Sequence, residues 1–345
     1  VHLTVEVTRE RSETGRATFG WKTDQMDIPR SCPQDLGTFW REALRQQRVS
    51  PRPEWIPRGT YDADEVRRYN VQSASIPEET DPQGYSCDEV VLEKLWFDAP
   101  GHRRLSGWYA SPPGGGPFPG LLVLPGAGCG PRPAPLEHAR HGYAALMLEI
   151  HGEDIECEQS STPEGYLEGP LGPKVEDDYY YRVYLGCVQA LEVLGSREEV
   201  AADRLGVMGA SQGGQLAIAT AAISGSVRAA ASSLCFYSCW PHRDHVEYLN
   251  EKGQPGTGAV PPFDRSDERQ NHMSYYDAMN LATLVTAPTI MMGCLCDQVS
   301  SPTSVNAAHR ALETEEKEIH WSPGTMHDHV IAFERRVWRW MEKNL

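Results

Sequence analysis

The sequence predicts an α/β fold with a mostly parallel central sheet flanked by helices, and three observations support this prediction. Short, continuous apolar runs such as Gly120 to Leu124 are typical of strands buried inside a parallel sheet. Segments with helical periodicity alternate with these runs, as expected where helices connect parallel strands. A glycine-rich turn at Gly209 to Gly214 joins one apolar run directly to a segment rich in helix formers.

The N-terminal residues 1–30 are predicted to lie outside the main domain. Val1 to Gly20 alternates between apolar and polar residues in the manner of a β-hairpin. One interpretation is the tail of an upstream β-sandwich domain, trimmed from a longer precursor. It favours a periplasmic or extracellular protein over a cytoplasmic one. The other interpretation is a local strand addition to the main sheet.

The main domain is predicted over residues 31–345. It opens with a helix from Pro33 to Arg48 and a linker rich in Pro and Arg from Ser50 to Gly59. Strands are then expected at residues 85–98, 104–111, 120–124, 143–150, 204–208, 229–234, 288–293 and 316–321, the last at a sheet edge. Helices are expected at residues 132–141, 179–194, 215–222 and 330–341. Long insertions follow two of the strands, at residues 151–175 and 240–272, and the second is predicted to form a lid.

The most informative motif is Gly209-Ala210-Ser211-Gln212-Gly213-Gly214. A Gly-x-Ser-x-Gly sequence between a strand and a helix is typical of a nucleophile elbow, a sharp turn that exposes the serine hydroxyl. The flanking glycines let the strand and the helix approach each other without a Cβ clash. A glycine-rich turn with an incidental serine is the alternative, but the strand and helix on either side favour the elbow.

A serine at an elbow needs a base and an acidic residue, which follow it in the chain with the acid first. Asp297 comes just after the strand predicted at residues 288–293, and His327 ends the loop after the strand at 316–321. We therefore predict Ser211, Asp297 and His327 as the catalytic residues. The alternatives are His329 as the base and a purely structural turn role for Asp297.

Several segments together resemble a known family. They are Asp177 to Arg182, the elbow, Ser274 to Asn280 and Gly293 to Asp297. They are similar to the acetyl xylan esterase and cephalosporin-C deacetylase family of α/β-hydrolases, and the similarity extends from Pro33 to the end of the chain. The resemblance implies an α/β-hydrolase catalytic domain over residues 31–345 and the same three catalytic residues. It also implies removal of acetyl groups from sugars or similar alcohols through an acyl-enzyme.

Two segments depart from the family pattern. Where the family has His-Gly-Tyr at the oxyanion loop, this chain has Pro125-Gly126-Ala127-Gly128. Where it has Arg-Gly-Gln-Gly, this chain has Ile150-His151-Gly152-Glu153. Because an oxyanion hole uses backbone N–H groups, Gln212 and Ala127 remain suitable donors. Without the tyrosine ring we do not expect strict acetyl selectivity. Trp240 and His151 are predicted to contact the substrate.

The composition of the chain limits the classes of binding partner that we expect. The net charge of −16 argues against nucleic acid and anionic membranes. The nine cysteines are scattered and odd in number, so free thiols are expected rather than a disulfide framework. We expect an ester of a small molecule or oligosaccharide as substrate, with no cofactor and no metal, and the resemblance implies a homo-oligomer. Hydrolysis of other acyl esters, lactones or peptides, and a non-catalytic relic of the fold, remain alternatives.

Overall fold

The computed structural model describes residues 2–8, 12–18, 31–73, 81, 83–101, 103–158, 161–166, 172–239, 248–249, 255–256 and 267–345. Trp240 and most of the lid predicted at residues 240–272 lie outside the described residues.

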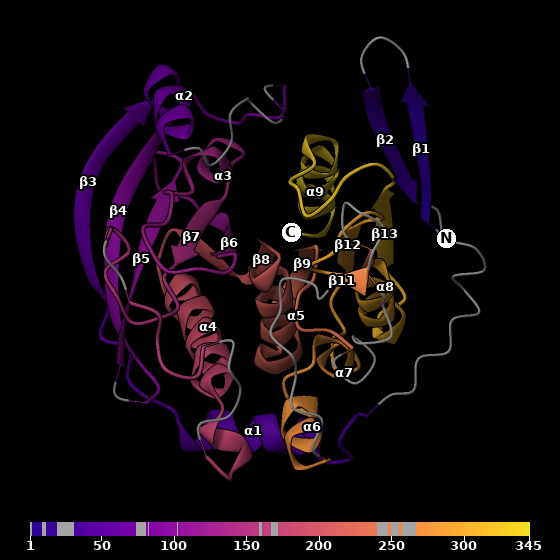
Figure 1. The fold of residues 1–345 in the computed structure, drawn as a ribbon. Coiled ribbons are helices and arrows are strands. Elements are labelled where there is room, and N and C mark those ends of the chain that lie inside the picture. The colour runs from indigo at the N-terminus through magenta and orange to yellow at the C-terminus, as the bar shows by residue number, and fades with distance from the viewer. Residues whose placement is uncertain are drawn as a thin grey trace.

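A nine-stranded sheet forms the centre of the described part of the chain, with the strand order β13-β12-β9-β8-β6-β7-β5-β4-β3 (Figure 1). The strands from β13 to β7 in this order run parallel, and β5, β4 and β3 extend the sheet in antiparallel fashion. Their bounds are β3 Glu54–Asp62, β4 Glu89–Ala99, β5 Arg103–Ser111, β6 Phe118–Leu124, β7 Ala144–Leu148, β8 Val200–Ala210, β9 Val227–Ser233, β12 Thr289–Cys294 and β13 Lys317–Ser322. This topology confirms the predicted α/β fold class.

Helices cover both faces of the sheet and divide its core in two. The described helices are α1 Leu36–Gln46, α2 Ala63–Gln72, α3 Leu136–Arg140, α4 Tyr179–Gly195, α5 Gln212–Ser224, α6 Asp267–Ser274, α7 Ala278–Ala282, α8 Pro302–Ala311 and α9 Ile331–Asn344. Side chains of α1, α4, α5, α7 and α8 pack into the larger core cluster. Side chains of α2, α3 and α9 pack into the second cluster on the other face. Because β6 and its neighbours are covered on both faces, their strands are continuously apolar.

The linker predicted at Ser50 to Gly59 is wrong, because β3 occupies most of it. This strand is mostly exposed and lies at the sheet edge, so it lacks the apolar pattern that marks a strand in sequence. A register shift between Pro57 and Gly59 interrupts its pairing with β4. A proline is tolerated at such an edge because one side of the strand needs no hydrogen-bonding partner.

Of two other predicted elements, one helix is shorter than expected and the N-terminal hairpin is present. The helix predicted at residues 132–141 is limited to α3, because Pro133 and Pro135 lack the N–H groups a helix needs and restrict the residue before them. The predicted N-terminal hairpin is confirmed as β1 His2–Thr8 and β2 Ser12–Thr18, which form a two-stranded sheet of their own and do not extend the nine-stranded one. An upstream domain stays a prediction.

Within the described ranges, no helix is both long enough and apolar enough to span a membrane.

Candidate active site

Ser211 occupies a strained turn between β8 and α5. Its backbone has φ 58° and ψ −121°, a conformation that residues with a side chain rarely adopt. The conformation is fixed on both sides: the Ser211 N–H donates to the Ser233 carbonyl at 2.9 Å, and its own carbonyl accepts from the Phe236 N–H at 3.2 Å. The turn therefore presents the hydroxyl at the carboxyl end of β8, above the sheet.

The glycines of the motif allow this turn because no side chain would fit in their place. A Cβ on Gly209 would lie 2.5 Å from the backbone of Gly213, and a Cβ on Gly213 would overlap the Leu124 carbonyl at the end of β6. The elbow is thus held by contacts between backbones.

His327 lies between the other two predicted catalytic side chains. Its Nε2 is 2.9 Å from the Ser211 Oγ, and its Nδ1 is 2.7 Å from the Asp297 Oδ2. Asp297 follows β12 and His327 follows β13, so two adjacent parallel strands deliver them to the same edge of the sheet. Three residues far apart in the chain therefore form one continuous hydrogen-bonded series.

Asp297 is held so that only one oxygen faces the imidazole. Its side chain has 0% exposed surface, and its Oδ1 accepts from the N–H groups of Val299 and Ser300 at 2.7 and 2.9 Å. A carboxylate only accepts hydrogen bonds, so the His327 Nδ1 must carry the proton. The His327 Nε2 is then left as an acceptor for the Ser211 hydroxyl.

His329, the alternative base, is engaged elsewhere. Its Nε2 is 2.7 Å from the Glu334 Oε1 in the first turn of α9, and this hydrogen bond raises the pKa of His329. Of the two histidines, His327 is the one whose ring is hydrogen-bonded to Ser211.

One tyrosine links the two segments predicted to form the oxyanion hole. The Tyr166 hydroxyl accepts from the Gly128 N–H at 2.9 Å and donates to the Gln212 Oε1 at 2.7 Å. Gln212 follows the serine and Gly128 follows Ala127, so a single hydroxyl ties the elbow to the loop after β6. Burial raises the pKa of Tyr166, which keeps its hydroxyl protonated and able to donate. Tyr166 was not predicted from the sequence, because no local motif marks its contacts with residues 38 and 46 positions away.

His151 supports the same loop from behind. Its ring is buried, its Nδ1 is 2.6 Å from the Tyr179 hydroxyl, and its Nε2 is 3.1 Å from the Gly128 carbonyl. Since a carbonyl only accepts, Nε2 donates and Nδ1 accepts from Tyr179. Burial lowers the pKa of His151, in keeping with this neutral ring. Both nitrogens are engaged within the protein, and a direct contact of His151 with substrate stays a prediction. Trp240 lies outside the described residues.

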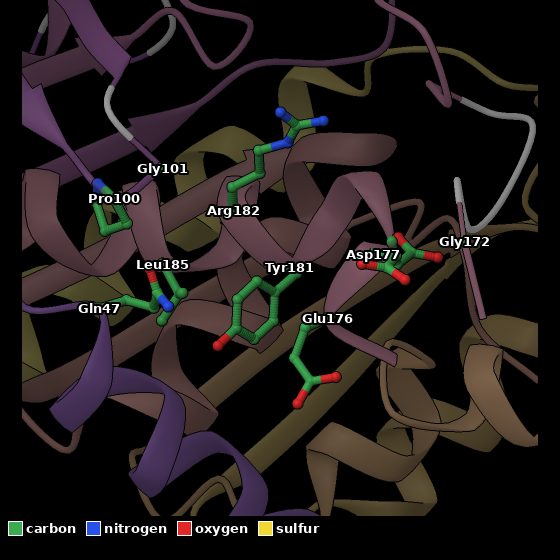
Figure 2. A pocket seen from close by; sticks show the side chains of 10 residues that line it. Gln47, Pro100, Gly101, Gly172, Glu176, Asp177, Tyr181, Arg182 and Leu185 are labelled. Carbon is green, nitrogen blue, oxygen red and sulfur yellow. The ribbon is translucent and has the colours of Figure 1, made fainter. Parts of the chain in front are cut away.

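A cavity of about 400 Å³ opens beside Ser211 and His327. A second cavity, of about 450 Å³, lies where the β4–β5 turn and the starts of η2 (Val175–Asp177) and α4 meet the end of α1 (Figure 2). In Figure 2 the guanidinium of Arg182 and the carboxylate of Glu176 point apart, so they do not converge on one ligand. Throughout the described residues, no group of three or more His, Cys, Asp and Glu side chains could hold a metal ion.

Comparison with known proteins identifies relatives of this chain. The chain is 27% identical over 331 residues to the acetyl esterase Axe7A of Xylanibacter ruminicola, with 88% of this chain and 67% of that protein covered. The solved acetyl xylan esterase of Paenibacillus sp. R4 has a TM-score of 0.71 at 24% identity, with 94% of this chain and 98% of that one covered. Acetyl xylan esterase 1 of Thermoanaerobacterium sp. JW/SL YS485 has a TM-score of 0.73 at 23% identity, covering 93% and 97%.

The two solved structures establish the α/β-hydrolase fold. The family model for acetyl xylan esterase (AXE1) matches residues 72–344, which is most of the chain and contains all three hydrogen-bonded side chains. The chain therefore belongs to the acetyl xylan esterase family and is a carboxylic ester hydrolase.

Proposed function

We propose that this esterase removes acetyl groups from sugars or oligosaccharides through Ser211, His327 and Asp297, by way of an acyl-enzyme. The observation that carries the proposal is the hydrogen-bonded series from the Asp297 carboxylate through the His327 ring to the Ser211 hydroxyl, at 2.7 and 2.9 Å. Family membership supports the acetyl ester as the bond that is cleaved.

The reaction proceeds in two acyl transfers. The Ser211 Oγ attacks the ester carbonyl while the His327 Nε2 takes its proton, and Asp297 stabilises the resulting imidazolium. The imidazolium returns that proton to the departing alcohol, leaving the acyl group on Ser211. A water molecule then attacks, with His327 again accepting the proton, and acetate leaves as Ser211 regains its hydrogen. Both proton transfers use the same ring nitrogen, so no cofactor is required.

The negative charge that develops on the carbonyl oxygen needs donors in fixed positions. We assign this role to the backbone N–H groups of Gln212 and Ala127, and loss of one such donor raises the barrier by about 3–4 kcal/mol in a comparable site. Tyr166 is a positioning residue in this proposal. Its hydroxyl contacts the side chain of Gln212 and the N–H of Gly128, and it fixes the spacing of the two donors.

The test is Ser211→Ala assayed with p-nitrophenyl acetate and with acetylated xylo-oligosaccharides. We expect hydrolysis of both to be abolished while the melting temperature stays near that of the wild type. A fluorophosphonate should add covalently to the wild type at Ser211 and fail to label the variant. Ser196→Ala is the matched control, because that hydroxyl is exposed and donates to the Val193 carbonyl at the end of α4. Turnover by Ser211→Ala, or labelling at another residue, would refute the proposal.

Assembly is a separate expectation. We expect the homo-oligomer implied by the family resemblance, and light scattering on the purified protein measures it directly.

A further inference from the structure

The backbone of Gly128 is held by side chains from three segments of the chain. Its N–H donates to the Tyr166 hydroxyl at 2.9 Å, and its carbonyl accepts from the His151 Nε2 at 3.1 Å. The Arg132 guanidinium also donates to this carbonyl. A carbonyl oxygen has two lone pairs, so His151 and Arg132 together use both. The N–H and the carbonyl of Gly128 are therefore both paired.

Gly128 depends on these contacts because packing does not fix it. Its φ is 111°, in the region that favours glycine. Its chain neighbours aside, a Cβ at this position would meet no atom of the described residues within 4 Å. The conformation is therefore set by the hydrogen bonds of Gly128. Because Ala127 directly precedes it, a displacement of Gly128 also displaces the Ala127 N–H.

His151 reaches Gly128 from a turn that is itself held by a buried carboxylate. The turn follows β7, and the Glu149 Oε2 accepts from the N–H groups of residues 151, 152 and 153 at 2.8, 2.9 and 3.0 Å. Glu149 is buried, so water does not compete for these bonds. The Tyr179 hydroxyl holds the other side of the ring by donating to Nδ1 at 2.6 Å. The ring thus faces Gly128 from a fixed position and in one tautomer.

His151 also packs against the tyrosine that holds the Gly128 N–H. The rings of His151 and Tyr166 meet edge to face, with centroids 4.7 Å apart and an angle of 72° between their planes. Tyr166 in turn donates to the Gln212 side chain at 2.7 Å. The two rings therefore form one packed unit between the segments that carry both assigned oxyanion donors.

We propose that His151 is a positioning residue of the oxyanion hole, which acts through the Gly128 carbonyl on the Ala127 N–H. This inference rests on the proposed function, in which the Ala127 N–H binds the carbonyl oxygen of the ester. The ring has no part in proton transfer, because both of its nitrogens are engaged within the protein. Its effect is on the transition state, in which the charge on that oxygen develops. Changes at His151 should therefore alter kcat more than KM.

Two amide variants separate the contacts of the two ring nitrogens. The amide nitrogen of glutamine lies as many bonds from Cα as the His151 Nε2, and the amide of asparagine matches Nδ1. His151→Gln therefore keeps a donor for Gly128, whereas His151→Asn keeps only an acceptor for the Tyr179 hydroxyl. With p-nitrophenyl acetate we expect kcat to fall by about tenfold in His151→Asn, the rate equivalent of one hydrogen bond, and by less than about threefold in His151→Gln.

KM should stay within about twofold of the wild type in both variants, since a positioning residue does not contact the bound substrate. An equal or larger loss of kcat in His151→Gln would overturn the inference. A rise in KM with unchanged kcat would also overturn it, because that result indicates a direct contact between His151 and the substrate.

A second readout distinguishes positioning from incomplete folding. Fluorophosphonate labelling of Ser211 counts the active sites, so that kcat is expressed per labelled site. Methylboronic acid forms a tetrahedral adduct with a serine and places an oxygen where the oxyanion lies, so its inhibition constant should rise by about tenfold in His151→Asn. A smaller folded fraction reduces only the number of sites, and an unchanged inhibition constant would contradict the positioning role. His320→Gln is the control, because that ring lies on β13 and contacts Glu318.

A double variant tests whether His151 and Tyr166 act on the same residue. Loss of either contact releases Gly128, so loss of the second should add little. We expect kcat of the double variant of Tyr166→Phe and His151→Asn to lie within about twofold of the lower single variant, whereas independent residues multiply their losses. Multiplied losses would contradict the inference.

Tyr179→Phe decides the question if His151→Asn gives too few labelled sites to assay. This variant leaves the contact between His151 and Gly128 in place, so kcat per site should stay within about threefold of the wild type. A loss of tenfold or more, about the value of a full hydrogen bond, would show that the ring acts through α4 and would refute the inference. If Ser211→Ala stays active, the proposed function falls and this inference with it. If Ser211→Ala is inactive and the His151 variants keep the wild-type kcat, only this inference falls.

Discussion

The cavity beside Ser211 and the cavity at the start of α4 have similar volumes, about 400 and 450 Å³, but their linings differ in kind. In the first, Ser211 and Leu234 have positive φ angles of 58° and 51°, and Ser211 begins a hydrogen-bonded series that ends on a buried carboxylate. In the second, no described residue other than glycine has such a backbone, and the Arg182 guanidinium and the Glu176 carboxylate point apart (Figure 2). Volume alone therefore does not mark a reactive site; convergence and stored strain do.

The largest expected difference between the two cavities comes from removing the base. We predict that His327→Ala lowers kcat for p-nitrophenyl acetate by about 10⁶-fold, because Ser211 then has no proton acceptor. Glu176→Gln in the cavity of Figure 2 should leave kcat within about twofold of the wild type. Comparable losses of kcat in the two variants would contradict the distinction between a reactive cavity and an unreactive one.

Asp297→Asn should have the next largest effect, a fall in kcat of about 10⁴-fold. The Val299 and Ser300 N–H groups require an acceptor, so the amide oxygen will face them and its NH₂ will face His327. The ring must then accept at Nδ1 and carry its proton at Nε2, where it cannot take the Ser211 proton. Asp177→Asn at the other cavity is the control. Steady-state measurement of kcat for both variants gives the difference.

Tyr166→Phe probes the link between the elbow and the loop after β6. We expect kcat to fall by about ten- to a hundredfold while KM stays nearly constant, because the donors are displaced and not removed. Tyr181→Phe removes a hydroxyl from the lining of the Figure 2 cavity and should change neither constant. If Tyr166→Phe instead raises KM alone, the hydroxyl acts on substrate binding and the positioning role is wrong.

The smallest effect concerns acid stability. Burial lowers the pKa of His138, which lines the cavity beside Ser211, to about 4, and that of His141 to about 4. Both rings take up protons more readily in the unfolded chain. The free energy of unfolding should therefore fall as the pH drops from about 6.5 toward 4, and the full stability should be present above about pH 6.5. His138→Gln should reduce the difference in melting temperature between pH 7 and pH 4.5. An unchanged difference would argue against this source of acid lability.

Local sequence was sufficient for much of the fold and for the elbow. The spacing of Gly209 and Gly213 around Ser211 reflects contacts between neighbouring backbones, which a short motif records. The buried strands β6, β8, β9 and β12 were predictable because covered strands must be apolar on both faces. Asp297 and His327 could be nominated because each follows one of the last two strands.

Other features of the structure have no local sequence motif that predicts them. Strand β3 is largely exposed at an edge, so its residues are selected for little more than pairing with β4. Tyr166 and His151 depend on partners that only the folded chain brings near. For His151 these are Gly128 and Tyr179, one at each ring nitrogen. Met147, Val123, Met208 and Ala231 are Cα partners across β7, β6, β8 and β9. This alignment of four strands is likewise specified by no single segment.

The position of β13 affects the temperature at which the enzyme loses activity. His327 lies in the loop after this strand. In the described sheet β13 is an edge strand, and it is only half-buried. Edge elements open at lower free energy than central ones, so transient fraying of β13 should separate the ring from Ser211 while the interior stays intact. Activity should then decline at temperatures below the calorimetric transition, with amide exchange in residues 317–322 faster than in β8.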